Sequence, residues 1–312
     1  MNINNHEIKK GRQTKLNLNV SRLSSSSMVE IPVIISRSTK PGPNVLLMAG
    51  MHGDEICGVE ILDRLMKSKR LKPLKGSIII IPKLNQYGFE NKQRYTKEGE
   101  DLNRCFPGNK NGSTAYKIAD KFMKSIFPLI DFGIDFHSGS GGRTNYPQVR
   151  CKTGSELELD LAKKFNQPFI VNASLRSGSL RKISTLQKKP ILLFEGGQSN
   201  VLDEFAIETA VNGTINLLES LRIIKPEKKK HTKLDMITMS SSRWTRADKS
   251  GIFKPNFEYG EYVKKGVILG ILESSNGDKV KIKNDQSGYI IGLNTSPVVN
   301  YNDPLFHIGY KA

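Results

Sequence analysis

The sequence predicts an α/β protein with a mixed, largely parallel sheet and helices on both faces, followed by a small all-β barrel or sandwich domain. Between residues 44 and 224, short apolar runs alternate with segments in which apolar residues recur at helical spacing. This alternation is typical of parallel strands joined by crossover helices. After a charged segment at residues 225–233, short apolar runs are separated by Gly, Asn and Pro without helical spacing. That second pattern is typical of strands alone.

The elements of the first region follow from the length and spacing of the apolar runs. Strands are expected at residues 44–49, 77–81, 132–136, 168–171 and 191–194. Helices are expected at residues 56–66, 115–126, 157–165, 180–186 and 201–221. The carboxyl ends of parallel strands share one edge of a sheet, where ligands bind. Functional side chains are therefore expected at or just after the ends of these strands.

The second region repeats itself with an offset of 37 residues. The segment Ser250–Phe253 corresponds to Ser287–Ile290, and Val267–Ile271 corresponds to Pro304–Ile308 without a gap. Two similar halves predict a pseudo-symmetric β fold. The pattern resembles biotinyl/lipoyl-type barrels, but Lys279 lacks the flanking residues of a modified lysine, so we expect a structural cap. The expected domains are residues 1–224, with about 21 residues as a peripheral extension, a linker at 225–233, and residues 234–312.

Composition narrows the class of protein. Hydrophobic residues make up 37% and charged residues 25% of the 312-residue chain, which argues against a disordered protein. No segment approaches the ~20 apolar residues that cross a bilayer, and the polar start lacks the apolar core of a secretory signal. Cys57, Cys105 and Cys151 fit neither a disulfide framework nor a CxxC metal site. We expect free thiols in a cytoplasmic protein without membrane segments.

The net charge of +18 lies almost wholly in the first region, because residues 234–312 contribute only +2. Basic excess can attract nucleic acid, acidic membranes or anionic small molecules. The basic residues are scattered, and the one tight run, Lys225–Lys230, lies in the expected linker. Aromatic residues that would stack on bases do not interleave with the lysines. Nucleic acid is therefore not the expected partner, whereas an anionic substrate is compatible with the charge.

The most informative motif is Gly50-Met51-His52-Gly53-Asp54-Glu55, which follows a strand and opens a helix. The side chains of His52 and Glu55 can meet at one point there, and both suit Zn²⁺. A catalytic zinc needs a third protein ligand and an open position. His137 comes just after the strand at 132–136 and provides a candidate, with Asp135 placed to orient a ligand. The alternative for His52 is a histidine that only satisfies a turn.

Two further features carry polar chemistry. Glu195 ends an apolar run, where a carboxylate is costly unless it is used or paired, so it is a candidate general base. Its alternative is an acid near the start of the next helix. Arg104 offers a planar fork for a carboxylate and Asn103 can donate beside it. By itself, Arg104 would be read as a surface ion-pair partner.

Together these motifs resemble the succinylglutamate desuccinylase/aspartoacylase family, which are zinc acylases related to zinc carboxypeptidases. The matching segments, in the family's order and with similar spacing, are Gly50–Glu55, Asn85–Phe89, Arg94, Asp101–Arg104, Asp135–His137, Ser179–Arg181 and Phe194–Gly197. The resemblance covers about residues 44–199, and the β region fits the family's C-terminal domain. It implies a zinc-carboxypeptidase-like fold.

The resemblance also implies roles. One Zn²⁺ per chain would be bound by His52, Glu55 and His137. Glu195 would act as general base and then as acid on an amide, and Arg94 would polarise the scissile carbonyl.

The substrate contacts implied by the resemblance are less complete. Asn103 and Arg104 would hold a substrate carboxylate, with Arg181 as a second anion contact. Asn85 is followed by Gln86 where the family commonly has Pro, a difference that affects loop shape. In aspartoacylase the C-terminal domain also lends a tyrosine to the site, and the sequence does not choose among Tyr259, Tyr262, Tyr289 and Tyr301. We take the other histidines as incidental, namely His6, His231 and His307.

The favoured function is zinc-dependent hydrolysis of an amide in an N-acyl amino acid. The alternative enzyme is a zinc carboxypeptidase acting on peptide C-termini, which the same catalytic residues would serve. The β domain favours the acylase, because in the resembling family it narrows the channel. A non-enzyme alternative is an anion-binding protein, but Glu195 has no use in a pure binder. The expected partner is a small N-acyl amino acid or short peptide, and the sequence does not predict the oligomeric state.

Overall fold

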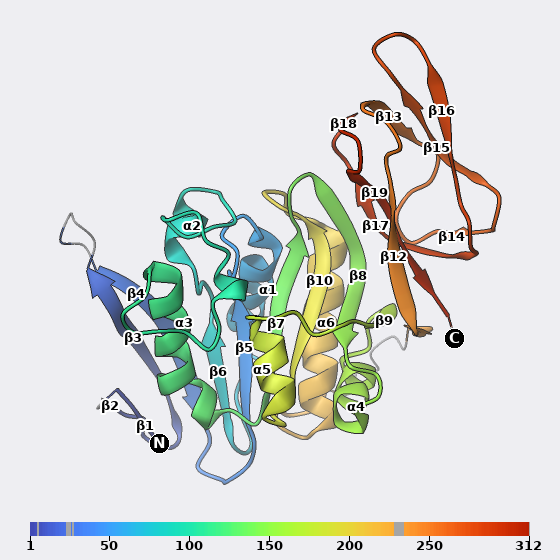
Figure 1. The fold of residues 1–312 in the computed structure, drawn as a ribbon. Coiled ribbons are helices and arrows are strands. Elements are labelled where there is room, and N and C mark those ends of the chain that lie inside the picture. The colour runs from blue at the N-terminus through green and yellow to red at the C-terminus, as the bar shows by residue number, and fades with distance from the viewer. Residues whose placement is uncertain (5, 23–25, 27, 228–233, 312) are drawn as a thin grey trace.

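The computed structural model describes residues 1–4, 6–22, 26, 28–227 and 234–311. The centre of its largest sheet consists of four parallel strands, in the order β6 (Ser77–Ile81), β5 (Asn44–Ala49), β7 (Phe132–Gly139) and β10 (Ile191–Gln198) (Figure 1). All four were predicted from apolar runs, as expected of strands buried on both faces. Both β7 and β10 run past their predicted ends, so His137 and Glu195 lie within strands rather than after them.

Helices cover both faces of this sheet, as the sequence predicted. One face is covered by α1 (Ile56–Lys67), α4 (Glu156–Phe165) and α6 (Glu204–Ser220), and the other by α3 (Thr114–Ser125) and α5 (Leu180–Leu186) (Figure 1). Each face has its own buried apolar core. Three short segments lie in connections: α2 (Gln86–Glu90), η1 (Leu102–Arg104) and η2 (Phe127–Leu129).

The start of α6 shows how an N-cap residue determines where a helix begins. The apolar pattern predicted a helix from residue 201, but the helix begins at Glu204. The carboxylate of Asp203 accepts a hydrogen bond of 2.9 Å from the backbone N–H of Ala206. Such an acid at the N-cap satisfies one of the unpaired N–H groups of the first turn. The residues before it, Val201 and Leu202, are therefore exposed loop.

Several strands that flank the parallel centre were not predicted. β3 (Arg12–Arg22) and β4 (Met28–Arg37) extend one edge, and β8 (Arg143–Cys151) pairs antiparallel with β10 on the other side. β3 alternates polar and apolar residues and has an exposed face, and β8 is largely polar, so neither has a long apolar run. β4 does have an apolar run, residues 31–35, which was not predicted as a strand. The N-terminal extension thus includes an edge strand of the main sheet. A separate pair is formed by β1 (Asn2–Ile3) and β2 (His6–Glu7).

The C-terminal strands form two sheets. A four-stranded sheet has the order β16 (Lys279–Lys283), β15 (Ile268–Glu273), β13 (Gly251–Pro255) and β18 (Val298–Val299). The other strands join the main sheet: β11 (Ile237–Met239), β12 (Ser241–Arg246), β14 (Tyr262–Val263), β17 (Gly288–Asn294) and β19 (Pro304–Tyr310). The 37-residue repeat places β13 over β17 and β15 over β19, and each half forms the same antiparallel pair. Both halves share a core in which Phe253 and Phe306 meet edge to face.

The C-terminal strands continue the main sheet without a break. Gly292 of β17 is the cross-strand partner of Asn145 of β8, and β11 pairs with β9 (Phe169–Asn172), which itself pairs with β8. The order from the centre outward is therefore β7, β10, β8, β17, β19 and β12. This continuity brings residues near 240 and 307 to the functional edge of the sheet.

Three further expectations concern the cysteines, membrane-spanning segments and the linker. All three cysteines are free and buried, as predicted. No helix among the described residues is long and apolar enough to cross a membrane. Of the linker expected at residues 225–233, residues 228–233 lie outside the described residues.

Candidate functional site

The turn that follows β5 presents His52 and Glu55. Gly50 has a φ of +65°, a conformation that glycine adopts without strain. A Cβ on Gly53 would lie 1.8 Å from the backbone carbon of Gly88, so only glycine permits the close approach of this turn to α2. The turn ends where α1 begins, at Ile56. Two side chains three residues apart are thereby fixed over the end of the parallel sheet.

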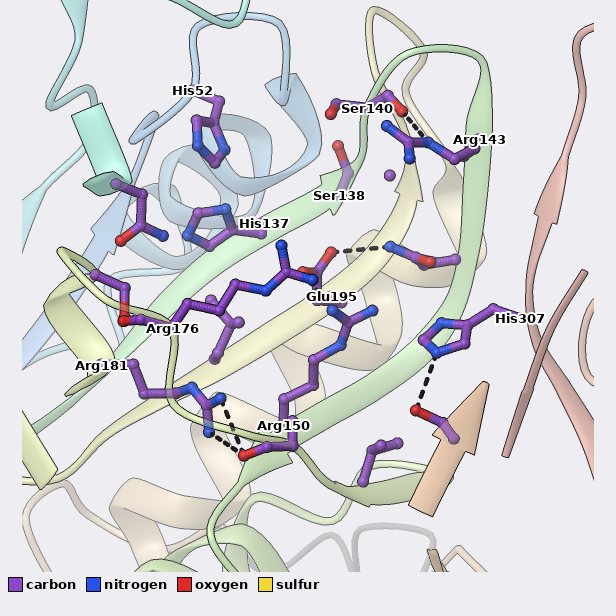
Figure 2. A pocket seen from close by; sticks show the side chains of 18 of the residues that line it. His52, His137, Ser138, Ser140, Arg143, Arg150, Arg176, Arg181, Glu195 and His307 are labelled. Carbon is purple, nitrogen blue, oxygen red and sulfur yellow. Dashed lines mark hydrogen bonds and ion pairs between the residues drawn. The ribbon is translucent and has the colours of Figure 1, made fainter. Parts of the chain in front are cut away.

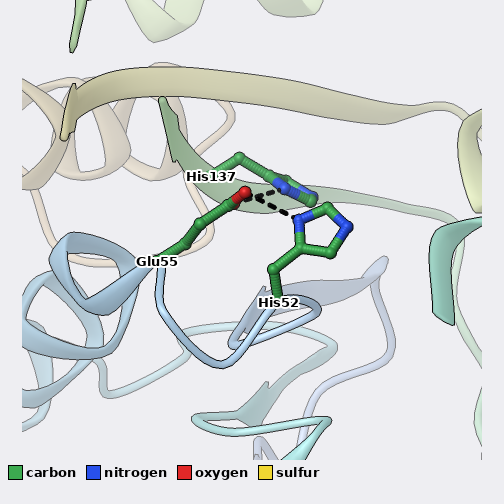
Figure 3. A group of neighbouring side chains, drawn as sticks. All are labelled: His52, Glu55 and His137. Atoms are coloured by element: carbon green, nitrogen blue, oxygen red, sulfur yellow. Dashed lines mark hydrogen bonds and ion pairs between the residues drawn. The ribbon is translucent and has the colours of Figure 1, made fainter. Parts of the chain in front are cut away.

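His52, Glu55 and His137 converge, as the sequence predicted (Figure 3). Glu55 lies between the two imidazoles: its Oε1 is 2.7 Å from Nδ1 of His52, and its Oε2 is 2.8 Å from Nδ1 of His137. The outward-facing Nε2 atoms meet other carboxylates. Nε2 of His52 is 3.1 Å from Asp101, and Nε2 of His137 is 2.8 Å from Asp135.

Burial and neighbouring charges shift the pKa values of this group. Burial opposes the ionisation of Glu55, but the two histidines hold its pKa well below the usual range. Burial likewise disfavours charged imidazoles, yet Glu55 and Asp101 raise the pKa of His52, and Asp135 and Glu55 raise that of His137 well above its ordinary value. The carboxylates therefore favour either protonated imidazole rings or a cation bound by this group of side chains.

The donor set fits a metal ion. One ligand atom from each of the three residues lies within 4.8 Å of the others, and all three side chains are buried. Imidazole and carboxylate ligands suit Zn²⁺. The carboxylates of Asp101 and Asp135 would fix the ring orientations from behind, as outer partners of metal-bound histidines do. In addition, the buried Oγ of Ser138 and Oδ1 of Asp54 lack a hydrogen-bond partner among the described residues, and both residues line the same pocket.

Glu195 lies next to this group because of strand register. Glu195 of β10 is paired with His137 of β7 on the neighbouring parallel strand, so their side chains emerge on the same face of the sheet. The side-chain amide of Asn145 donates a hydrogen bond of 2.8 Å to Oε2 of Glu195. Arg150 forms an ion pair of 3.4 Å with its Oε1. The carboxylate is thus held from the β8 side while it borders the pocket.

Arg94 is bound into the group of His52, Glu55 and His137. Its guanidinium donates to Oε1 of Glu55 at 3.2 Å, to Oδ2 of Asp101 at 2.8 Å and to Oγ of Ser140 at 2.9 Å. Burial opposes its charge, but Glu55 and Asp101 raise the pKa of Arg94. This guanidinium is therefore a fixed positive charge beside the three converging side chains.

The three residues expected to contact substrate anions all line the pocket. The side-chain carbonyl of Asn103 accepts a hydrogen bond of 3.1 Å from the backbone N–H of Leu180, which leaves its NH₂ without a partner in the described part of the chain. The side chain of Arg104 is partly exposed, and its guanidinium nitrogen Nη2 lies 3.9 Å from Oδ2 of Asp101. The guanidinium of Arg181 donates to the carbonyl of Ala173 at 3.2 Å, so it also fixes the neighbouring loop.

The pocket has a volume of about 990 Å³ and lies over the ends of the central strands. It extends from His52 and His137, past Glu195, to residues of the C-terminal strands (Figure 2). Among the latter are Trp244 of β12 and His307 of β19.

Comparison with known proteins places this geometry in a family. Residues 41–221, more than half of the chain, match the model of the succinylglutamate desuccinylase/aspartoacylase catalytic domain. The chain belongs to the succinylglutamate desuccinylase/aspartoacylase family. The chain is 26% identical over 294 residues to the N-alpha-acetyl-L-2,4-diaminobutyric acid deacetylase of Halomonas elongata, covering 89% of this chain and 84% of the relative. It is 28% identical over 169 residues to the succinylglutamate desuccinylase of Pseudomonas fluorescens, covering 49% of this chain and 45% of that one.

Solved structures of the family share the fold over the whole chain. The ectoine utilization protein EutE of Ruegeria pomeroyi, solved with product bound, matches with a TM-score of 0.85 at 23% identity, covering 97% of both chains. The succinylglutamate desuccinylase/aspartoacylase of Rhodobacter sphaeroides matches with a TM-score of 0.85 at 20% identity, covering 98% of both. These likenesses confirm the predicted fold class, including the β region. Both curated relatives are named for removing an acyl group.

The C-terminal contribution differs from the one that the family resemblance implied. Among the described residues lining the pocket, none is one of the four candidate tyrosines. Tyr259 instead packs on Tyr146 and donates to Asp203 at 3.4 Å, and Tyr301 is exposed. The β region is thus more than a structural cap, because it supplies pocket residues of other types.

Sequence reasoning missed those residues. His307 was taken as incidental, yet it is buried in the pocket lining and its ring stacks on Trp244 at 4.7 Å. Arg150 and Arg176 were not singled out, although both line the pocket. One signal was available: Trp244 is the chain's single tryptophan, in a polar strand where an apolar side chain of that size needs a reason.

Proposed function

We propose that this chain hydrolyses the amide bond of an N-acyl amino acid, with Zn²⁺ bound by His52, Glu55 and His137 and with Glu195 as the general base. The observation that carries the proposal is the register of β7 and β10, in which Glu195 is the direct neighbour of His137. This places a partly buried carboxylate beside a buried donor set that suits zinc. Membership of a family whose curated relatives are deacylases supports the same reading.

Each of these residues would take the catalytic role that its surroundings favour. A zinc ion there would supply Lewis acidity, which lowers the pKa of water and polarises an amide carbonyl. Glu195 would take the proton from the attacking water and later pass it to the leaving amine. Asn145 and Arg150 fix the carboxylate of Glu195 for both transfers. The fixed guanidinium of Arg94 offers a positive charge where the carbonyl oxygen becomes negative.

The substrate would be held through its carboxylate. The side-chain NH₂ of Asn103 and the guanidinium of Arg104 lie on the pocket lining, and together they can donate to one carboxylate. The C-terminal strands β12 and β19 border the same pocket, which favours a small substrate over a long peptide. A peptide with a free C-terminus is the competing substrate class.

The test compares Glu195→Gln with the wild type and with Glu208→Gln, which alters an exposed glutamate of α6. Metal content is measured by elemental analysis, and kcat is measured on N-acetyl- and N-succinyl-amino acids and on a dipeptide. We expect about one zinc per chain in all three proteins. Loss of the base should lower kcat by roughly 10²- to 10⁴-fold, with Glu208→Gln at the wild-type rate. Near wild-type kcat in Glu195→Gln would refute the assigned role, and faster cleavage of the dipeptide would replace the deacylase with a carboxypeptidase.

A further inference from the structure

The connection between β7 and β8 forms one wall of the pocket. Because β10 lies between these two strands in the sheet, the connection passes over the end of β10. Gln198, the last residue of β10, pairs with Gly139 on one side and with Thr144 on the other. We call residues 138–143 the crossing loop, and most of them line the pocket. The loop therefore lies just beyond Glu195, on the strand that carries the proposed base.

Two groups of the crossing loop contact residues to which the proposed reaction gives a role. The backbone N–H of Ser138 donates a hydrogen bond of 3.2 Å to Oε2 of Glu55, an expected metal ligand. The hydroxyl oxygen of Ser140 accepts a hydrogen bond of 2.9 Å from Nη1 of Arg94, which is expected to polarise the scissile carbonyl. The loop is thus more than a connection between strands, because it touches two parts of the expected chemistry.

The guanidinium of Arg94 is fixed through both of its terminal nitrogens. Nη2 donates to Oδ2 of Asp101 at 2.8 Å, and Nη1 has its shortest contact with Oγ of Ser140. A planar group held through two nitrogens keeps one orientation, whereas a group held through one nitrogen can turn about that contact. Nη1 also lies 3.2 Å from Oε1 of Glu55, but that carboxylate is one of the donors that suit a metal ion. Ser140 is the acceptor for Nη1 that no metal would share.

The crossing loop is itself held from two sides. Within the loop, Nε of Arg143 donates to the backbone carbonyl of Ser140 at 2.6 Å (Figure 2). From the turn after β17, the backbone N–H of Thr295 donates to the carbonyl of Gly142 at 2.7 Å, and its hydroxyl donates to the same oxygen at 2.8 Å. A Cβ on Gly139 would lie 2.2 Å from the backbone oxygen of Arg143, so the loop closes tightly. Through this loop the C-terminal region supports the side chain of Arg94.

We propose that Ser140 is a positioning residue for Arg94, and that Thr295 acts through Ser140 by holding the crossing loop in place. The inference rests on the proposed deacylase function, in which Arg94 faces the carbonyl oxygen. Negative charge on that oxygen develops only as the amide is attacked, so a misplaced guanidinium weakens the transition state more than the bound substrate. Loss of the Ser140 hydroxyl should therefore lower kcat and leave KM nearly constant.

Steady-state kinetics test this split between kcat and KM. The variants are Ser140→Ala, Ser140→Thr and the control Ser275→Ala, which alters an exposed serine in the turn between β15 and β16. The zinc-loaded proteins are assayed on N-acetyl- and N-succinyl-L-glutamate. We expect kcat to fall roughly 10-fold in Ser140→Ala, the scale of a hydrogen bond to a charged group, with zinc content and Tm unchanged. Ser140→Thr keeps the hydroxyl and should retain most of the rate. A wild-type kcat in Ser140→Ala, or a loss that lies in KM alone, would overturn the role.

Coupling to Arg94 separates positioning from a general structural role. Arg94→Met keeps much of the side-chain length but has no hydrogen-bond donor. If Ser140 acts through Arg94, adding Ser140→Ala to Arg94→Met lowers kcat no further, whereas independent effects multiply. Thr295→Ala should lower kcat about 2- to 5-fold, as expected for one hydrogen bond, and this loss should vanish in the Ser140→Ala background. Multiplying effects of Ser140→Ala and Arg94→Met would overturn the inference.

Crystal structures of the zinc-loaded wild type and Ser140→Ala provide a readout that needs no turnover. Nη1 of Arg94 should occupy one position in the wild type and should be displaced, or divided between positions, in Ser140→Ala. An unmoved guanidinium would overturn the positioning role even if kcat falls. If the wild type hydrolyses no amide, the deacylase proposal fails, and a displaced guanidinium in Ser140→Ala would still support the positioning of Arg94.

Discussion

The two ends of the pocket are built in opposite ways. At the histidine end, His52, Glu55 and His137 are buried and each meets at least one further charged or polar partner. At the other end, Arg176 and His307 line the pocket. The guanidinium of Arg176 forms no hydrogen bond or ion pair with another described residue, and Nδ1 of His307 has no hydrogen-bond partner among them. At the first end, the three converging side chains are hydrogen-bonded within the protein, although the nearby Oγ of Ser138 and Oδ1 of Asp54 have no partner among the described residues. The second end leaves the hydrogen-bonding capacity of Arg176 and His307 open to water or to a ligand, and polar groups that a ligand must satisfy are one source of specificity.

This difference between the two ends of the pocket indicates what amino-acid substitutions at each end should change. The proposed chemistry requires one fixed arrangement of metal ligands and base, and the residues proposed for these roles lie at the strand ends of the parallel sheet. Specificity requires complementarity to one substrate, and the other end of the pocket is lined by a loop and by β strands that reach it through pairing with β8. Substitutions at the histidine end should therefore change metal binding and kcat. Substitutions at the end of the pocket that holds Arg176 and His307 should instead change KM and the choice of substrate.

The largest expected effect is that of removing a ligand. In His137→Ala, we expect loss of bound zinc and a fall in kcat/KM of about 10³-fold, since the ion's contribution is several kcal/mol. Elemental analysis and steady-state kinetics measure both quantities. The control is His6→Ala, which alters an exposed histidine of β2 and should keep full zinc and activity. Full zinc in His137→Ala would remove this residue from the metal site.

A smaller effect on the same end is expected behind the ligand. In Asp135→Asn, the contact of 2.8 Å to Nε2 of His137 loses its negative charge while the shape of the side chain is kept. Such outer partners typically contribute 10- to 100-fold to metal affinity. Competition with a chelator measures the dissociation constant for zinc, and Asp278→Asn, in an exposed turn, serves as the comparison. Unchanged zinc affinity would mean that Asp135 does not orient His137 for metal binding.

The sequence predicted one end of the pocket and not the other, for a physical reason. His52, Glu55, His137 and Glu195 adjoin long apolar runs, and the carboxyl ends of parallel strands must share an edge. Their meeting is therefore readable from local patterns. His307 reaches the pocket only because β17 pairs with β8 across more than a hundred residues of sequence, and no local pattern records that pairing. β8, the strand that carries Arg150, was also not predicted, because its sequence is largely polar.

A third prediction tests the connection between the two ends. A Cβ on Gly292 would lie 2.8 Å from Oδ1 of Asn145, the residue whose amide holds Glu195. Gly292→Ala should displace Asn145 and lower kcat by roughly 2- to 10-fold, the value of one hydrogen bond. Zinc content should not change, because no ligand moves. Gly154→Ala meets no atom within 4 Å and should behave as the wild type, whereas an equal fall in both variants would point to a general loss of stability.

The smallest effect is expected at Trp244, which lines the pocket beside His307. Trp244→Phe keeps an aromatic ring against His307 but reduces the stacked area, so only part of the roughly 0.5–1.5 kcal/mol of such a pair is lost. We expect KM for the preferred substrate to rise about twofold while kcat stays constant, because the proposed base and metal ligands lie several strands away. A fall in kcat at constant KM would instead mean that this tryptophan supports the reacting groups, and the separation of the pocket into a chemical end and a binding end would fail.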